Sequence, residues 1–238
     1  MEASGRRIEV GRVIGEAFET YRDQAGALLG GALIVIGITA LIDNLLGLTG
    51  SIILLFAGLI VGLIGQVLYT GYVVKLVQDV RDGRRDSSMS ELFEAAAPYV
   101  TTLILNGILY GLAVFLGFLA LIVPGLILIT IWAVVAPSIV VEDQGVFGAF
   151  GRSRELVRGD GWSVFGVIVV AFLIVLIVGG VFAVIGASIG DAGRVVLGTL
   201  GSVLVVPVQA LVASILFFDL RGGSGAGSAA EPPEAPAA

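Results

Sequence analysis

Between Glu94 and Glu142 the chain carries 47 consecutive residues without a charge. Three further stretches, residues 44–74, 161–190 and 195–218, also contain no Asp, Glu, Lys or Arg. A helix of a water-soluble protein needs one polar face, which runs of this length cannot supply. About 20 apolar residues span the ~30 Å of hydrocarbon in a bilayer. The sequence therefore predicts an integral membrane protein.

The uncharged runs fit helices rather than the strands of a closed barrel, the two architectures that satisfy every backbone group within lipid. Strands of a membrane barrel alternate polar and apolar residues, whereas residues 52–64 and 167–178 are apolar at odd and even positions alike. We expect an all-α, polytopic membrane helix bundle with six transmembrane helices and short cytoplasmic amphipathic helices. The predicted spans are Ala25–Ile42, Ser51–Val74, Tyr99–Leu116, Gly125–Val141, Ser163–Val184 and Val195–Phe217.

The longest uncharged run is long enough for two of these helices, and Pro124 divides it. Proline is tolerated in the first turn of a helix, so the fourth span is expected to begin there. The apolar residues 117–123 are then expected to form a loop within the membrane interface.

Basic residues, which set the orientation of membrane proteins, fall almost entirely on one side of the predicted spans. The two termini and the second and fourth connections hold 12 of the 13 Lys and Arg residues, and the opposite side holds only Arg194. This asymmetry predicts that both termini are cytoplasmic. Residues 1–221 should form one membrane domain, and residues 222–238, which include no large apolar side chain, a disordered cytoplasmic tail.

A short amphipathic stretch precedes every second predicted span. Glu16, Glu91 and Glu155 each lie shortly before such a span, and the apolar residues around each share one helical face. An aromatic residue belongs to each face, at Phe18, Phe93 and Phe150. This pattern indicates a cytoplasmic interfacial helix followed by a transmembrane hairpin, three times over. The alternative is that any helix entering the membrane needs an amphipathic lead-in.

The residue types that are absent exclude several kinds of chemistry. The chain has no Cys and no His, so disulfides, thiolate nucleophiles, Ser–His pairs and zinc sites built on these residues are excluded. No predicted span carries an ionisable residue near its centre, which argues against an ion-coupled carrier. No basic patch indicates a nucleic-acid partner. We predict no enzymatic activity, no catalytic or metal-binding residue and no cofactor.

Three polar residues lie near the middle of predicted spans: Gln66, Asn106 and Gln209. At 1.5 Å per residue they would lie roughly 13–18 Å from the cytoplasmic edge. Such side chains avoid lipid, and two roles remain open for them. They form interhelical hydrogen bonds worth only about 0.6–2 kcal/mol each, or they line a polar site for a substrate.

The most strongly charged cytoplasmic segment near a span contains Arg152, Arg154 and Arg158. Arginines at this depth attract anionic lipid headgroups by about 1 kcal/mol each. The three residues are therefore candidates for contact with headgroups or with a partner protein. The alternative is that they fix the topology and form ion pairs with acidic residues of the same connection.

Several short motifs of the second half resemble those of a known family. They are Val123-Pro124-Gly125, Ala136-Pro137, Glu142-Asp143-Gln144-Gly145, Arg152-Ser153, Glu155-Leu156 and Arg158-Gly159. The chain resembles the glycerophosphoryl diester phosphodiesterase membrane-domain family and its archaeal relatives. That resemblance implies a six-helix protein of the prokaryotic cell membrane. It does not imply the phosphodiesterase activity of the soluble enzyme fused to some relatives, because that chemistry uses His.

These observations favour a non-enzymatic multi-pass protein of the prokaryotic plasma membrane, acting as a scaffold or as an assembly partner of envelope or lipid machinery. The alternative is a lipid or small-molecule transporter that uses the polar region of Gln66, Asn106 and Gln209. The partners expected are membrane lipids and either another membrane protein or a second copy of the chain.

Overall fold

The computed structural model describes residues 8–47, 51–83 and 87–228, which contain helices but no strand. The helices are α1 (Val10–Asp23), α2 (Ala25–Gly47), α3 (Ile52–Arg81), α4 (Met89–Ala96), the 3-10 helix η1 (Ala97–Tyr99), α5 (Val100–Ala120), α6 (Ile122–Ile131), α7 (Val135–Glu142), α8 (Val146–Val157), α9 (Gly161–Ile189) and α10 (Asp191–Ser228). In this described part, six helical segments are long and apolar enough to cross a membrane: Ala25–Ile42, Ile52–Arg81, Met89–Ala120, Ile122–Glu142, Gly161–Ile189 and Asp191–Gly223. The predicted all-α membrane fold is confirmed.

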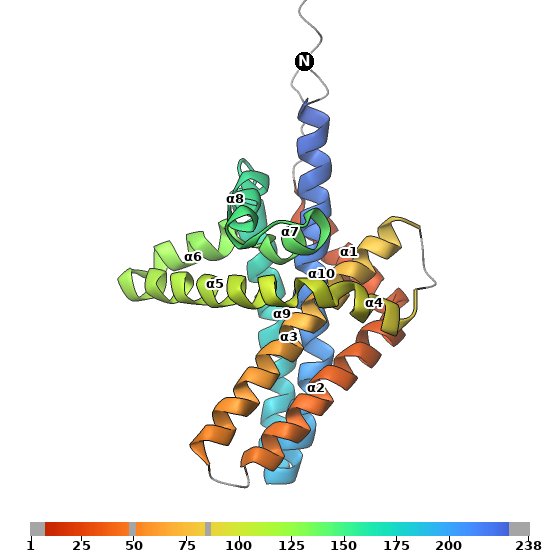
Figure 1. The fold of residues 1–238 in the computed structure, drawn as a ribbon, viewed down its shortest axis with the longest axis vertical. Coiled ribbons are helices and arrows are strands. Elements are labelled where there is room, and N and C mark those ends of the chain that lie inside the picture. Colours follow the sequence, from red (N-terminus) through yellow and green to blue (C-terminus); the bar gives the residue numbers. More distant parts are fainter. Residues whose placement is uncertain (1–7, 48–50, 84–86, 229–238) are drawn as a thin grey trace, which may run out of the picture.

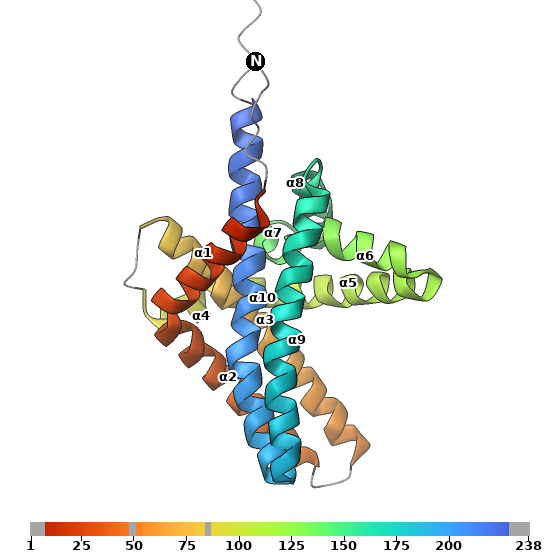
Figure 2. The same ribbon diagram turned by 180° about the vertical axis from the view of Figure 1, so that it is seen from behind.

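The long helices form three hairpins, α2–α3, α5–α6 and α9–α10, and a short helix (α1, α4 or α8) precedes each of them. The hairpins α2–α3 and α9–α10 extend toward the same end of the molecule, whereas α5–α6 extends sideways (Figures 1 and 2). We call α5–α6 the arm and the other two hairpins the trunk. The order of elements is the one expected for three repeats of an amphipathic helix and a hairpin.

The short helices pack on the hairpins through their apolar faces. Val13 of α1 and Leu92 of α4 are buried. Phe93 stacks on Tyr72 of α3, with the ring centroids 4.4 Å apart. By contrast Phe18 of α1 remains 54% exposed. The amphipathic pattern is therefore used mainly for packing against the protein, and only part of it is left for lipid.

Two tyrosines of α3 hold α2 close to it. The Tyr69 hydroxyl donates to the Leu28 carbonyl at 2.9 Å, and the Tyr72 hydroxyl donates to the Ala27 carbonyl at 2.8 Å. Both tyrosines are fully buried. The ring of Tyr72 fits against α2 because residue 31 is a glycine. A Cβ atom at Gly31 would lie 2.9 Å from that ring.

The fourth predicted span, Gly125–Val141, corresponds to the segment Ile122–Glu142, and within it a turn separates α6 from α7. Pro137 lies in the first turns of α7 and has no N–H to donate to Ala133, four residues earlier, and its ring crowds that carbonyl. Ser153 of α8 forms hydrogen bonds with backbone groups on both sides of this turn. Its hydroxyl donates to the Ile131 carbonyl at 3.0 Å and accepts from the Val134 amide at 3.3 Å.

The prediction of a loop over residues 117–123 is wrong. Helix α5 continues to Ala120, and the chain reverses through the extended backbone of Leu121 (φ −168°, ψ 157°). Close approach of Gly117 and Gly125 makes this possible, since a Cβ at Gly117 would lie 3.1 Å from the Gly125 backbone. The arm therefore ends in a tight turn between two long helices.

The disordered tail was expected to begin at residue 222, directly after Arg221. Helix α10 instead continues to Ser228. It contains Pro207, so the carbonyl four residues earlier lacks its usual donor. At the next residue, Leu204, the carbonyl accepts a hydrogen bond from the Tyr21 hydroxyl at 3.0 Å. Side chains of neighbouring helices commonly support the backbone of membrane helices around proline in this way. The predicted disorder of residues 229–238 lies outside the described residues.

Candidate functional site

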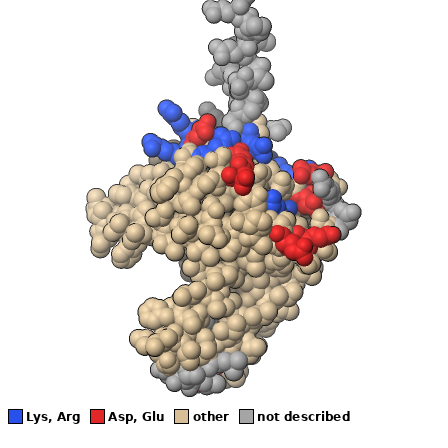
Figure 3. Space-filling model, viewed as in Figure 1, with Lys and Arg blue, Asp and Glu red and all other residues tan. Residues whose placement is uncertain are grey.

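The charged side chains gather at one end of the molecule. In the face shown in Figure 3 they lie where α8 and the C-terminal part of α10 are found and, at the right, where α4 and the end of α3 lie, and most of the body below is uncharged. Arg194 pairs with Asp191 (3.5 Å) at the first turn of α10, far along that helix from this end. Arg6, Arg7, Arg84 and Arg85, which the orientation argument also used, lie outside the described residues.

One ion cluster joins α1, α3 and α10 at the charged end. Asp219 is only 7% exposed and lies 3.0 Å from Arg12 and 3.4 Å from Arg81, measured between carboxylate oxygen and guanidinium nitrogen. Glu16 also pairs with both arginines. Burial raises the pKa of Glu16 above its usual value of 4.5, against the attraction of Arg81. This cluster fixes where the trunk helices and α1 meet.

A second ion cluster joins α7, α8 and α10, and it accounts for one of the predicted headgroup contacts. Arg152 donates two hydrogen bonds to Glu142, at 2.7 and 3.0 Å, and a third to Glu155 at 3.0 Å. Arg221 lies 3.6 Å from the same Glu142 carboxylate. The hydrogen bonds to Glu142 raise the pKa of Arg152 above its usual value. The guanidinium of Arg152 is therefore occupied within the fold.

The other two predicted contacts, Arg154 and Arg158, line a cavity of about 560 Å³. This cavity, which we call the arginine cavity, lies between α8, the α8–α9 connection and the end of α6 at Ile131. Both arginines are exposed. Neither forms an ion pair with a residue that the structure describes.

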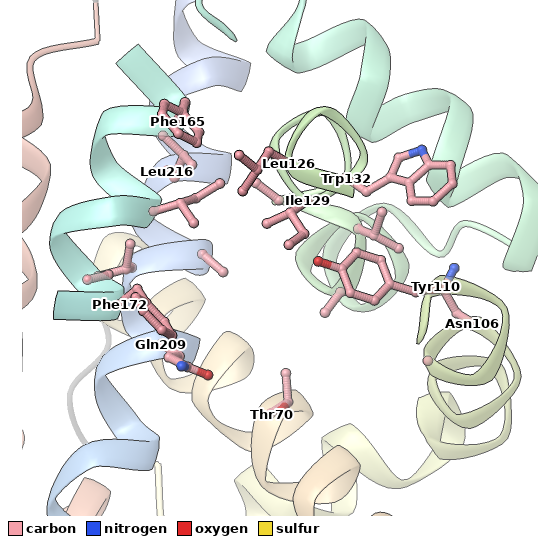
Figure 4. Close-up of a pocket in the computed structure, with 18 of the residues that line it drawn as sticks. Thr70, Asn106, Tyr110, Leu126, Ile129, Trp132, Phe165, Phe172, Gln209 and Leu216 are labelled. Carbon is pink, nitrogen blue, oxygen red and sulfur yellow. The ribbon is translucent and has the colours of Figure 1, made fainter. Parts of the chain in front are cut away.

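A larger cavity, of about 610 Å³, separates the arm from the trunk. We call it the lateral cleft; residues of α3, α5, α6, α9 and α10 line it. Figure 3 shows the hollow beside the trunk, and Figure 4 shows its apolar wall, including Leu126, Phe172 and Leu216. The cleft exists because the arm extends sideways from the trunk and leaves a space between them.

The structure brings two of the three predicted polar residues to the lateral cleft. Asn106 and Gln209 line it from the arm and the trunk respectively, whereas Gln66 does not. Asn106 is buried, and its amide nitrogen donates to the Val146 carbonyl at 3.2 Å. Gln209 is exposed and forms no side-chain hydrogen bond with the described residues. Gln66 lies one turn from Thr70 on the same face of α3, beyond the cleft.

The cleft is also lined by three residues with polar groups that the sequence analysis did not single out: Thr70, Tyr110 and Trp132. The Tyr110 hydroxyl points into the cleft, across from Gln209 on the opposite wall (Figure 4). Its ring packs against Trp132, with the centroids 6.1 Å apart. The signal available in the sequence was the spacing of Asn106 and Tyr110, four residues apart on one helical face.

The lateral cleft offers a few hydrogen-bonding groups within apolar walls. Among the residues that line it, none is acidic or basic, and Tyr110 is the one ionisable group. The described part of the chain brings no three potential metal-ligating side chains together. A cavity of 300–1,000 Å³ with apolar walls and a few polar groups is typical of sites for small apolar molecules.

Comparison with known proteins gives the family. The model of an uncharacterised protein family, UPF0259, matches residues 37–208, which include the arm and most of both trunk hairpins. The chain belongs to the UPF0259 family. A UPF0259 membrane protein of Pectobacterium carotovorum subsp. carotovorum (strain PC1) is 34% identical over 104 residues, which cover 44% of this chain and 41% of that protein. No solved structure matches.

Membership of UPF0259 corrects the resemblance drawn from short motifs. The chain does not belong to the glycerophosphoryl diester phosphodiesterase membrane-domain family. The residues behind that resemblance serve local structure: Pro137 lies in the first turn of α7, and Arg152 pairs with Glu142. Features of this kind suit many helical membrane proteins, so they do not separate families. What both assignments share, a multi-pass membrane protein, is confirmed.

Proposed function

We propose that this UPF0259 protein is a non-enzymatic protein of the prokaryotic plasma membrane that binds a lipid in its lateral cleft. The observation that supports this is the cleft itself, an apolar cavity of about 610 Å³ between arm and trunk without acidic or basic lining. In lipid, an open apolar space has to be filled by an apolar molecule. The proposed guest is a membrane lipid, because its chains are the apolar groups present at high concentration.

The polar groups of the cleft favour a guest with a polar end rather than a pure hydrocarbon. The Tyr110 hydroxyl and the Gln209 amide have no hydrogen-bond partner among the described residues. A polar group left unpaired in an apolar medium costs several kcal/mol. An ester carbonyl or a hydroxyl of a lipid would supply the missing partners from between the two walls. This gives the cleft both its affinity and its selectivity.

The proposed orientation places the charged end, with both termini, in the cytoplasm. Twelve of the 13 basic residues of the whole chain belong to the connections on that side, and an excess of Lys and Arg marks cytoplasmic loops. Reporter fusions after Arg221 and within residues 43–50 test this. Cytoplasmic activity of the first and extracytoplasmic activity of the second are expected, and the reverse pair of results would contradict the orientation.

A scaffold function is the second candidate, and one feature of the arm favours it. Gly107 and Gly111 lie one turn apart on α5, and a Cβ at either would meet nothing within 4 Å. Glycines four residues apart let membrane helices approach closely. The pair therefore offers a surface for a transmembrane helix of a partner or of a second copy. Because Gly107 also lines the cleft, a partner helix would compete with the proposed lipid.

Native mass spectrometry of the purified protein distinguishes these functions. Gly107→Leu should fill the cleft without disturbing the fold, since the position has open space. Gly62→Leu is the matched control, because its Cβ also meets nothing within 4 Å and it does not line the cleft. We expect wild type and Gly62→Leu to retain one lipid through delipidation and Gly107→Leu to lose it.

Two other outcomes would redirect the assignment. Equal lipid retention by all three proteins, or none by wild type, would contradict lipid binding in the cleft. A copurifying polypeptide lost only in Gly107→Leu would favour the scaffold. If lipid binds, movement of a labelled lipid between leaflets of proteoliposomes then separates a transporter from a static lipid-binding protein.

A further inference from the structure

We propose that the arginine cavity binds the phosphate of an anionic lipid headgroup through Arg154 and Arg158. The cavity of about 560 Å³ has these two guanidinium groups in its lining. Neither group has an ion-pair partner in the part of the chain that the structure describes. This sets them apart from Arg12, Arg81 and Arg152, which carboxylates of the fold engage.

Three glycines expose the main chain to the cavity. Gly151, Gly159 and Gly161 line it, and a Cβ at any of the three would meet nothing within 4 Å. Gly159 has φ +102°, a conformation that other residues rarely adopt. A tetrahedral phosphate can therefore approach the main chain between the two arginines. The planar guanidinium fork suits such an oxyanion, since it donates two parallel hydrogen bonds to it.

One carboxylate also lines the cavity, and the fold offsets its charge. Glu155 accepts a hydrogen bond from Arg152 at 3.0 Å. Arg152 in turn holds Glu142 on its other side. The second ion cluster therefore leaves Arg154 and Arg158 as the charges free to meet a ligand, which gives the cavity a positive potential.

The depth of the cavity points to a lipid rather than to a solute. Trp162, next to the lining residue Gly161, is 87% exposed, as expected for a tryptophan at headgroup level. The uncharged helix α9 begins at Gly161 and runs 29 residues to Ile189, which suffices to cross the hydrocarbon. The phosphates of the same leaflet would therefore lie at the height of the arginines. Lipid binding here is independent of the lateral cleft, although it shares the proposed orientation.

The test uses the full-length protein in neutral detergent with short-chain phosphatidylglycerol as the probe. Affinity is measured by the change in tryptophan fluorescence, with phosphatidylcholine of the same chain length as the zwitterionic comparison. Each arginine contributes about a fivefold change in affinity at a membrane surface. The variant Arg154→Gln/Arg158→Gln should therefore bind phosphatidylglycerol roughly 25-fold more weakly than wild type does. Phosphatidylcholine, whose choline group offsets the charge of its phosphate, should bind wild type more weakly and should lose less affinity in the double variant.

Two controls separate the alternatives. Arg22→Gln removes an equally charged and highly exposed residue and should leave the affinity unchanged. The roughly 25-fold difference should persist in a Gly107→Leu background, where the lateral cleft is filled, so failure of cleft binding and failure of this site are distinguishable. Unchanged affinity in the double variant would overturn the proposal, and so would equal weakening by Arg22→Gln. Competition by inorganic phosphate at the lipid's own concentration would assign the cavity to a free phosphate instead. If the double variant does not fold, the two single variants give the same comparison.

Discussion

The contact between Gly31 and Tyr72 gives a sharp test of how α2 and α3 pack. A Cβ at Gly31 would lie 2.9 Å from Cε1 and 3.2 Å from Cζ of Tyr72, closer than such atoms approach. The ring cannot withdraw easily, because it is fully buried, stacks on Phe93 and donates its hydroxyl to the Ala27 carbonyl. Gly31→Ala must therefore displace either the ring or the whole of α2.

The expected cost follows from these contacts. Overpacking in a dense core costs about 1–3 kcal/mol, and loss of the Tyr72 hydrogen bond about 1 kcal/mol. The better helix propensity of alanine returns up to about 1 kcal/mol. Gly31→Ala should therefore destabilise the protein by about 1–3 kcal/mol, equivalent to a drop in Tm of roughly 2–12 °C. Gly37→Ala, on the same helix with nothing within 4 Å of its Cβ, should leave Tm unchanged or raise it.

Thermal unfolding in detergent, followed by circular dichroism, measures the difference. Replacing the ring provides the internal check. In a Tyr72→Leu background the added methyl group has space, so Gly31→Ala should cost little there. The coupling between the two substitutions should be about 1–3 kcal/mol. Equal Tm values for Gly31→Ala and Gly37→Ala, or the same cost with and without the tyrosine ring, would refute the reasoning.

Three further predictions concern individual side chains. Asn106→Leu should lower stability by about 0.6–2 kcal/mol because a buried interhelical hydrogen bond is lost, whereas Gln209→Leu should change it by less than about 0.5 kcal/mol; equal thermal shifts would contradict this. Tyr21→Phe should cost about 1 kcal/mol and speed hydrogen exchange in α1, because it releases the Leu204 carbonyl; unchanged exchange would argue against that tether. Because burial raises the pKa of Glu16 above 4.5, the native state binds more protons than the unfolded chain just above that pH, so wild type should gain stability relative to Glu16→Gln between pH 7 and pH 5. A stability difference independent of pH would contradict that shift.

The sequence predicted the membrane class and the helices because both depend on strong local signals. Runs without charge can only be spans, and the amphipathic stretches around Phe18, Phe93 and Phe150 correspond to α1, α4 and α8. The break after Ile131 was missed although Pro137 signalled it. Length alone favoured one helix there, and the side chain that stabilises the break, Ser153, comes from a helix distant in the sequence.

For the candidate sites too, the sequence identified the residue types but not the contacts between helices. Arg152, Arg154 and Arg158 looked equivalent in the sequence because all three are basic residues of one connection. The structure separates them, since only Arg152 faces Glu142. That distinction depends on the angle between α7 and α8, which no local pattern encodes. Likewise Gln66 and Gln209 are both glutamines in the middle of spans, yet only Gln209 faces the lateral cleft.

The direction of the arm is the feature that the sequence leaves most open, and it is also what creates the cleft. Helix α5 exposes apolar side chains on several sides, among them Leu105, Leu112 and Phe115. A helix that is apolar all round has no preferred face to bury in lipid, so its packing is decided by a few specific contacts. Asn106 supplies one of them, through its hydrogen bond to Val146 at the start of α8. The same residue lines the cleft, so the contact that orients the arm also forms part of the wall of the proposed lipid site.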